Sequence, residues 1–134
     1  MRSDKTLKRW YSRINKRFFS ASLPVDVCVR WANEEEEKEL TWEEKYFGWT
    51  TNNEKEGHDS QHHSYTIVLS RTKHGGAHYC RPHSTILSTL AHEMCHVATQ
   101  LKDDHGPAFE KWRQKIADKG FFKKGALLKG LTTF

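Results

Sequence analysis

The segment that decides the fold is HSTILSTLAHEMCHVATQL, residues 83–101. Its apolar side chains recur every three or four residues and predict one buried helical stripe, made of Ile86, Leu90, Met94, Val97 and Leu101. A polar stripe lies beside it, made of Thr85, Thr89, His92, His96 and Thr99. Pro82 suits the first turn of such a helix, or Ser84 its cap. The segment therefore predicts a long amphipathic helix to about Leu101, with two histidines on one side.

Residues 92–96, His-Glu-Met-Cys-His, form an H-E-x-x-H motif. Because positions i and i+4 stack one turn apart, His92 and His96 can bind one metal ion. Glu93 lies about 100° further round the helix, so it misses the metal but can reach water beside it. A catalytic zinc takes three protein ligands and activates a water in the fourth position. The motif predicts a zinc site with Glu93 as general base. A chance match in a chain rich in His and Glu is the alternative.

A third ligand has to come from outside the motif. The metzincin pattern needs a glycine and a histidine at the positions of Thr99 and Lys102, so it is excluded. A gluzincin uses a glutamate on a following helix, and Glu110 is the nearest. His105 is the better candidate, because it lies at the break before the next helix and Gly106 permits a tight turn toward the metal. A surface loop histidine is the alternative reading of His105.

The remaining segments predict an α+β fold. A helix is marked by Leu7, Trp10, Tyr11, Ile14 and Phe18, with Ser3 or Asp4 as its cap. Three strands are predicted at residues 25–31, 46–51 and 65–70, and a last helix from residue 107 to about 119. We expect a zincin-like single domain with an N-terminal helix, a small three-stranded sheet, the H-E-x-x-H helix and a following helix. Residues 65–71 are expected to form an edge strand that pairs with an extended substrate.

The composition fits one compact domain. The chain has 134 residues, 36% of them hydrophobic, with 5 Trp, 4 Tyr and 7 Phe. No stretch approaches about 18 apolar residues, and the charged N-terminus lacks the apolar region of a secretory signal, so no membrane association is predicted. Cys28, Cys80 and Cys95 lack framework spacing and indicate reduced thiols. We expect an intracellular protein, nuclear in a eukaryote and otherwise cytoplasmic, and favour a monomer.

The net charge of +5 is spread unevenly. Residues 34–44 hold seven Glu and one Lys, whereas residues 1–19 hold seven Lys or Arg and one Asp. Such a basic region indicates a polyanionic partner such as DNA. A solvated surface without a partner is the alternative.

In combination, the motifs resemble the SprT-like zinc metallopeptidases and their Spartan-like protease core. The residues that carry the resemblance are Arg81-Pro82, TLAHEMCH at 89–96 and HGPAF at 105–109, with Phe18-Phe19 to Leu23-Pro24, Trp31, Gly48-Trp49 and IVLS at 67–70 upstream. The resemblance covers most of residues 7–117. It implies zinc at His92, His96 and His105, with Glu93 as the catalytic residue. It also implies cleavage of proteins, often proteins attached to DNA.

Many relatives of this kind carry a Cys-rich zinc ribbon and a DNA-binding module after the core, and residues 118–134 contain neither. We therefore expect residues 1–134 to form one SprT-like metallopeptidase domain with its core at about 7–117.

The predicted function is zinc-dependent endopeptidase action on protein substrates, in particular DNA-associated or DNA-crosslinked ones. The alternative is a non-enzymatic, basic nucleic-acid-binding module with a structural metal. A fourth protein ligand such as Cys80 or His78 would indicate that alternative.

Overall fold

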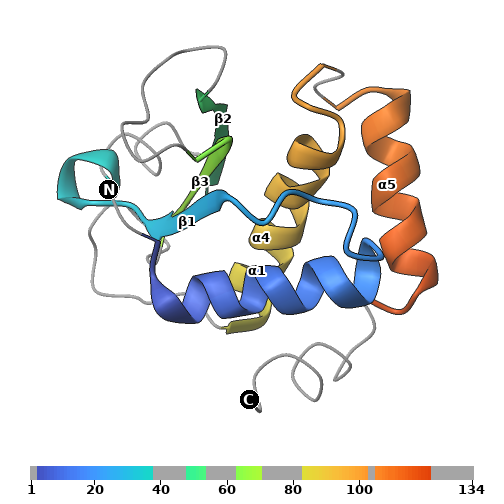
Figure 1. The fold of residues 1–134 in the computed structure, drawn as a ribbon, viewed down its shortest axis with the longest axis horizontal. Coiled ribbons are helices and arrows are strands. Elements are labelled where there is room, and N and C mark those ends of the chain that lie inside the picture. Colours follow the sequence, from blue (N-terminus) through green and yellow to red (C-terminus); the bar gives the residue numbers. More distant parts are fainter. Residues whose placement is uncertain (1–2, 38–47, 54–62, 71–82, 103–104, 122–134) are drawn as a thin grey trace.

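The computed structural model describes residues 3–37, 48–53, 63–70, 83–102 and 105–121. Its elements, in chain order, are α1 (Lys5–Phe18), β1 (Val27–Trp31), β2 (Gly48–Asn52), β3 (Tyr65–Leu69), α4 (His83–Ala98) and α5 (Pro107–Asp118). A single further turn of helix covers residues 34–37. The predicted α+β class is confirmed, with the helices and strands in the expected order (Figure 1).

The first helix, α1, begins at a side-chain cap. The Asp4 carboxylate accepts hydrogen bonds from the amides of Thr6 and Leu7, each at 3.0 Å. The Ser3 hydroxyl, the other expected cap, instead accepts a bond from the Val29 amide of β1 at 2.9 Å. Asp4 therefore caps the helix, while Ser3 ties its start to the sheet.

The segment after α1 is held against the helix by buried polar side chains. Asn15 exchanges two hydrogen bonds with the backbone of Leu23, both at 3.0 Å. The Tyr11 hydroxyl donates to the Pro24 carbonyl at 2.6 Å. These bonds satisfy backbone groups that would otherwise be buried without partners. They direct the chain back along α1, so that β1 lies beside the start of the helix.

The sheet has the strand order β1-β3-β2. β1 is parallel to β3, with Val27 opposite Tyr65, and β2 is antiparallel to it, with Gly48 opposite Leu69. β3 thus has a neighbour on each side, so the expectation that residues 65–71 form an edge strand is wrong (Arg71 lies outside the described residues). Four of the five residues in β3 are buried, as expected for a central strand. Among the described strands, β1 and β2 are the outer ones.

The helix α4 passes through the middle of the core. It contacts α1, β2, β3 and α5 (Figure 1). Its fully buried apolar side chains lie on several sides of the helix and include Leu87, Leu90, Ala91, Met94 and Cys95. Burial on several sides is typical of a central helix. α4 is therefore held on several sides, which fixes the direction of its side chains. None of the described helices is long and apolar enough to cross a membrane.

Candidate metal centre

Two histidines lie one turn apart on α4, as the spacing of the motif predicts. The ring centroids of His92 and His96 are 5.1 Å apart. His96 is buried, with 8% of its surface exposed, and His92 is half-buried. The pair therefore has one imidazole in the core and one nearer to solvent.

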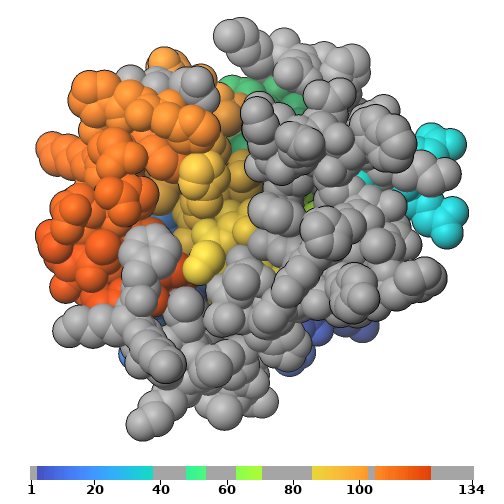
Figure 2. Space-filling model, turned by 180° about the vertical axis from the view of Figure 1, so that it is seen from behind, coloured from blue at the N-terminus to red at the C-terminus, as the bar shows by residue number. Residues whose placement is uncertain are grey.

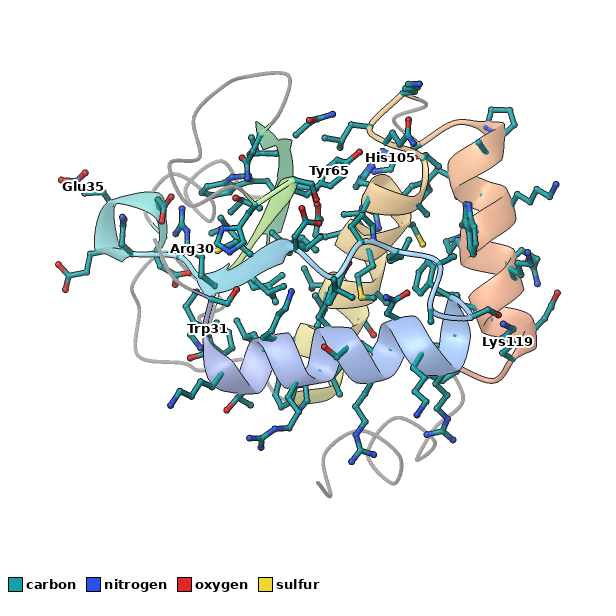
Figure 3. All side chains as sticks on the ribbon, viewed as in Figure 1. Arg30, Trp31, Glu35, Tyr65, His105 and Lys119 are labelled. Carbon is teal, nitrogen blue, oxygen red and sulfur yellow. The ribbon has the colours of Figure 1, made fainter. Side chains whose placement is uncertain are left out.

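A reversal of the chain after α4 brings the third histidine back to this pair. α4 ends at Ala98, before the expected Leu101, because Gln100 and Leu101 take left-handed φ values of 56° and 58°. The Leu101 amide donates to the His96 carbonyl at 2.9 Å, as in a Schellman turn. Consecutive non-glycine residues in this conformation cost about 1–2 kcal/mol each. Figure 3 shows His105 beyond the end of α4 and beside the start of α5.

The three imidazoles fit one metal ion. Nε2 of His105 lies 3.2 Å from Nε2 of His92, and one ligand atom from each of the three histidines lies within 4.8 Å of the others. Two nitrogens bound to one tetrahedral zinc are about 3.3 Å apart, given bonds of about 2.0–2.1 Å. Imidazole is a ligand that suits zinc among the divalent metals. His105 is exposed, so one side of the cluster opens to solvent.

A buried aromatic ring lies against all three histidines. The Phe109 ring centroid is 4.9 Å from that of His92, 4.6 Å from that of His96 and 4.9 Å from that of His105. Phe109 comes from the first turn of α5 and is 1% exposed. Its contacts limit the orientations that the imidazoles can take. The sequence alone assigned Phe109 no role at the metal centre.

Glu93 directly follows His92 on α4 and is buried, with 6% of its surface exposed. Its Oε1 accepts a hydrogen bond of 2.8 Å from the Thr50 hydroxyl of β2. Burial raises the pKa of the Glu93 carboxyl to about 7, and the bond from Thr50 acts in the opposite direction. A carboxyl with a pKa near neutrality suits proton transfer in both directions.

The environment of His92 favours its neutral form. Burial lowers the pKa of His92, and the neighbouring His105 lowers it further. A neutral imidazole is the form that binds a metal ion. The neutral form of His92 is therefore favoured near pH 7, so His92 can bind a metal ion without first losing a proton.

Comparison with known families agrees with these observations. The sequence profile of the SprT-like family matches residues 7–126. The chain belongs to the SprT-like family. Members of this family are generally metal-dependent and metallopeptidase-like, and the histidine cluster of this SprT-like chain could hold a metal ion. No solved structure matches the chain.

Among the described residues, the other possible ligands, Glu110 and Cys95, do not belong to this histidine group. Glu110 is exposed and forms an ion pair with Arg113 at 2.9 Å, outside the described group of possible metal ligands. Cys95 is buried, and burial raises the pKa of its thiol to about 12, which disfavours the thiolate that binds metals. Cys80 and His78 lie outside the described residues. Among the described residues, the donor set is therefore the three histidines.

A pocket of about 280 Å³ adjoins the histidine cluster between α4 and α5. It is lined by Ser88, His92, Cys95, Arg113 and Ile116. Figure 2 shows side chains of α4 reaching the surface beside α5. Space beside His92 is thus available to a bound molecule.

Proposed function

We propose that this chain is a zinc-dependent endopeptidase. The observation that carries the proposal is the convergence of His92, His96 and His105, with ligand atoms within 4.8 Å of one another. Glu93 directly follows His92 on the same helix. Three protein ligands with one open side are typical of a catalytic zinc site, whereas structural sites are closed by four. The metallopeptidase-like character of the SprT-like family supports the same reaction class.

The three histidines are the residues that would hold the metal. Bound zinc would supply Lewis acidity, which polarises a carbonyl and makes water a stronger acid at neutral pH. Phe109 limits the rotation of the imidazoles, since its ring lies within 5 Å of all three.

Glu93 is the proposed catalytic residue. Its carboxylate accepts a proton from the attacking water and passes it to the leaving amine. Its burial and its hydrogen bond to Thr50 keep the carboxyl in one place while it exchanges that proton. Proton transfer by a positioned group contributes typically about 10²–10⁴-fold to the rate.

An extended segment of protein is the proposed substrate, and β2 is the strand that would bind it. The outer side of β1 is partly occupied, because the Asp4 amide donates to the Val29 carbonyl at 2.8 Å. β2 has β3 as its neighbour in the described sheet and contacts α4. Backbone pairing along β2 would give affinity with little dependence on sequence. The pocket beside His92 would take one substrate side chain.

DNA-associated proteins are the proposed substrate class, supported by the basic surface of α1. Its exposed cationic side chains are Lys5, Arg9, Arg13, Lys16 and Arg17. All but Lys5 line a surface pocket together with Ser12. α1 lies at the opposite end of the molecule from His105 (Figures 1 and 3). Nucleic acid on α1 and peptide at the metal centre would therefore not compete for one surface.

The test is hydrolysis of an unfolded protein by zinc-loaded enzyme, with Glu93→Gln as the control. We expect the variant to bind zinc as wild type does and to lose at least about 100-fold in kcat. Equal hydrolysis by the two proteins would exclude this mechanism. X-ray absorption at the zinc edge counts protein ligands. Four protein ligands would support the alternative of a binding module with a structural metal.

The DNA part of the proposal has a separate test. The same substrate is supplied free or covalently attached to single-stranded DNA. The double variant Arg13→Glu, Lys16→Glu should slow cleavage of the attached substrate and leave cleavage of the free one unchanged. Binding of wild type to the DNA should weaken steeply with salt. Absence of binding at low salt would remove DNA from the proposal.

A further inference from the structure

The outer strand β2 packs closely against both β3 and α4 at Gly48. A Cβ atom added at Gly48 would lie 2.7 Å from the Val68 carbonyl oxygen, 3.0 Å from Cδ2 of Leu69 and 3.2 Å from Cγ2 of Thr89. A side chain at position 48 would therefore push β2 away from β3 and from α4. Glycine at this position permits the close approach of a strand to the metal-binding helix.

The spacing of residues on one face of β2 also matches the spacing of residues on the facing side of α4. Gly48 and Thr50 are two residues apart and so lie on the same face of β2. Thr89 and Glu93 are four residues apart and so lie on the same face of α4. Two strand residues span about 6.8 Å and four helical residues about 6 Å. Gly48 faces Thr89, and Thr50 consequently reaches Glu93.

The contact between Thr50 and Glu93 is a directed hydrogen bond. The Thr50 hydroxyl oxygen lies 2.8 Å from Oε1 of Glu93 and 3.3 Å from the Glu93 carbonyl oxygen. A hydroxyl has one proton to donate, and the shorter contact is to the carboxylate. Oε1, rather than Oε2, is the carboxylate oxygen that the Thr50 hydroxyl binds.

We propose that Thr50 is a positioning residue that holds Oε1 of Glu93 and thereby directs Oε2 toward the attacking water. This inference rests on the proposed peptidase function, because it assigns Thr50 a role in orienting the base. An outer-shell bond of this kind limits the rotation of a carboxylate that would otherwise be free to turn. Thr50 acts through Glu93, because the group that its hydroxyl binds is the Glu93 carboxylate.

The deciding variants are Thr50→Val, which keeps the side-chain shape and removes the hydroxyl, and Thr50→Ser, which keeps the hydroxyl. Thr6→Val makes the same change on the exposed face of α1, away from the metal centre, and is the matched control. We expect Thr50→Val to lower kcat about 10–100-fold, with KM and zinc affinity within about threefold of wild type. Thr50→Ser and Thr6→Val should keep kcat within about threefold. If Thr50→Val unfolds at the assay temperature, Thr50→Ala takes its place.

A second readout does not depend on hydrolysis. In protein carrying ¹³C-labelled glutamate side chains, the carboxyl signal of Glu93 is the one absent from Glu93→Gln. This signal should move in Thr50→Val and stay in place in Thr50→Ser and Thr6→Val.

Two results would overturn the inference. One is an unchanged kcat in folded Thr50→Val while Glu93→Gln is inactive. That result would exclude the positioning role of Thr50 but would agree with the proposed peptidase function. The other is a Glu93 carboxyl signal that does not move in Thr50→Val. Absence of hydrolysis by wild type would instead count against the proposed function, and the carboxyl signal would still decide whether Thr50 holds Glu93.

Discussion

Helices α1 and α4 place their polar side chains in opposite environments. On α1, Leu7 and Ile14 are fully buried, while the exposed cations include Arg9 and Arg13. On α4, the buried residues include Glu93 and His96 along with the apolar ones. α1 follows the usual separation of a surface helix into an apolar and a polar face. α4 departs from it at Glu93 and His96, in the candidate metal centre.

The burial of polar residues on α4 changes their ionisation and affects stability. Burying a carboxyl disfavours its ionised form, and here burial raises the pKa of Glu93 to about 7. A polar group buried in this way lowers stability unless it is bonded, and Thr50 supplies a bond to Glu93. Strongly shifted groups in accessible clusters are candidates for function. The apolar residues buried on both helices therefore stabilise the fold, whereas the polar residues buried on α4 are candidates for function.

The largest effect is expected at the metal. His96→Ala should lower zinc affinity by more than the 10–100-fold typical of losing an outer-shell partner, because it removes a ligand itself. Competition with a chromophoric chelator measures the affinity. Arg13→Ala on the exposed face of α1 is the control and should bind zinc as wild type does. Wild-type affinity in His96→Ala would place the metal elsewhere.

A large effect on stability is expected in the apolar part of α4. Leu90 is fully buried, so Leu90→Ala should lower the free energy of unfolding by about 2–5 kcal/mol. Arg9→Ala on α1 should change it by no more than about 0.5 kcal/mol. Urea denaturation measures both. A loss below 1 kcal/mol in Leu90→Ala would contradict a central position for α4.

A smaller effect concerns pH. Because the pKa of Glu93 is raised from 4.5 to about 7, the folded protein keeps a proton that the unfolded chain releases. As far as Glu93 is concerned, the free energy of unfolding is highest below about pH 4.5, where the carboxyl is protonated in both the folded and the unfolded protein. It falls as pH rises through about 7. Metal-free wild type should therefore lose stability relative to Glu93→Gln between pH 5 and 8, by on the order of 2–3 kcal/mol. Denaturation in the presence of a chelator measures the difference, and a difference that shrinks with rising pH would contradict it.

The smallest effect is expected at the start of α1. Asp4→Ala removes the cap that bonds Thr6 and Leu7, at a cost of about 1 kcal/mol in the free energy of unfolding. Asp4→Asn keeps an accepting oxygen and should cost only a few tenths of that. Thermal unfolding compares the two. Equal losses in both variants would show that the charge of Asp4, rather than its hydrogen bonds, stabilises the helix.

Much of the fold could be predicted because it depends on local patterns. The apolar spacing of α1 and α4 and the alternation of the strands correctly identified helices, strands and their order. Strand neighbours could not be predicted, because pairing joins segments that are far apart in the chain. The expected edge strand, residues 65–71, contains β3, which pairs with both β1 and β2. The end of α4 was also missed, because Gln100 and Leu101 adopt a conformation usually taken by glycine.

The sequence by itself determined the pairing of His92 with His96, since four residues make about one turn of any α-helix. It also identified His105 as a candidate, from its place at a helix break and from family resemblance. Only the tertiary structure decided that His105 returns to within 3.2 Å of His92, that Phe109 lies against all three rings, and that Thr50 bonds Glu93 across 43 positions of the chain. Contacts of this kind depend on how separate elements pack, and no local pattern in the sequence encodes them.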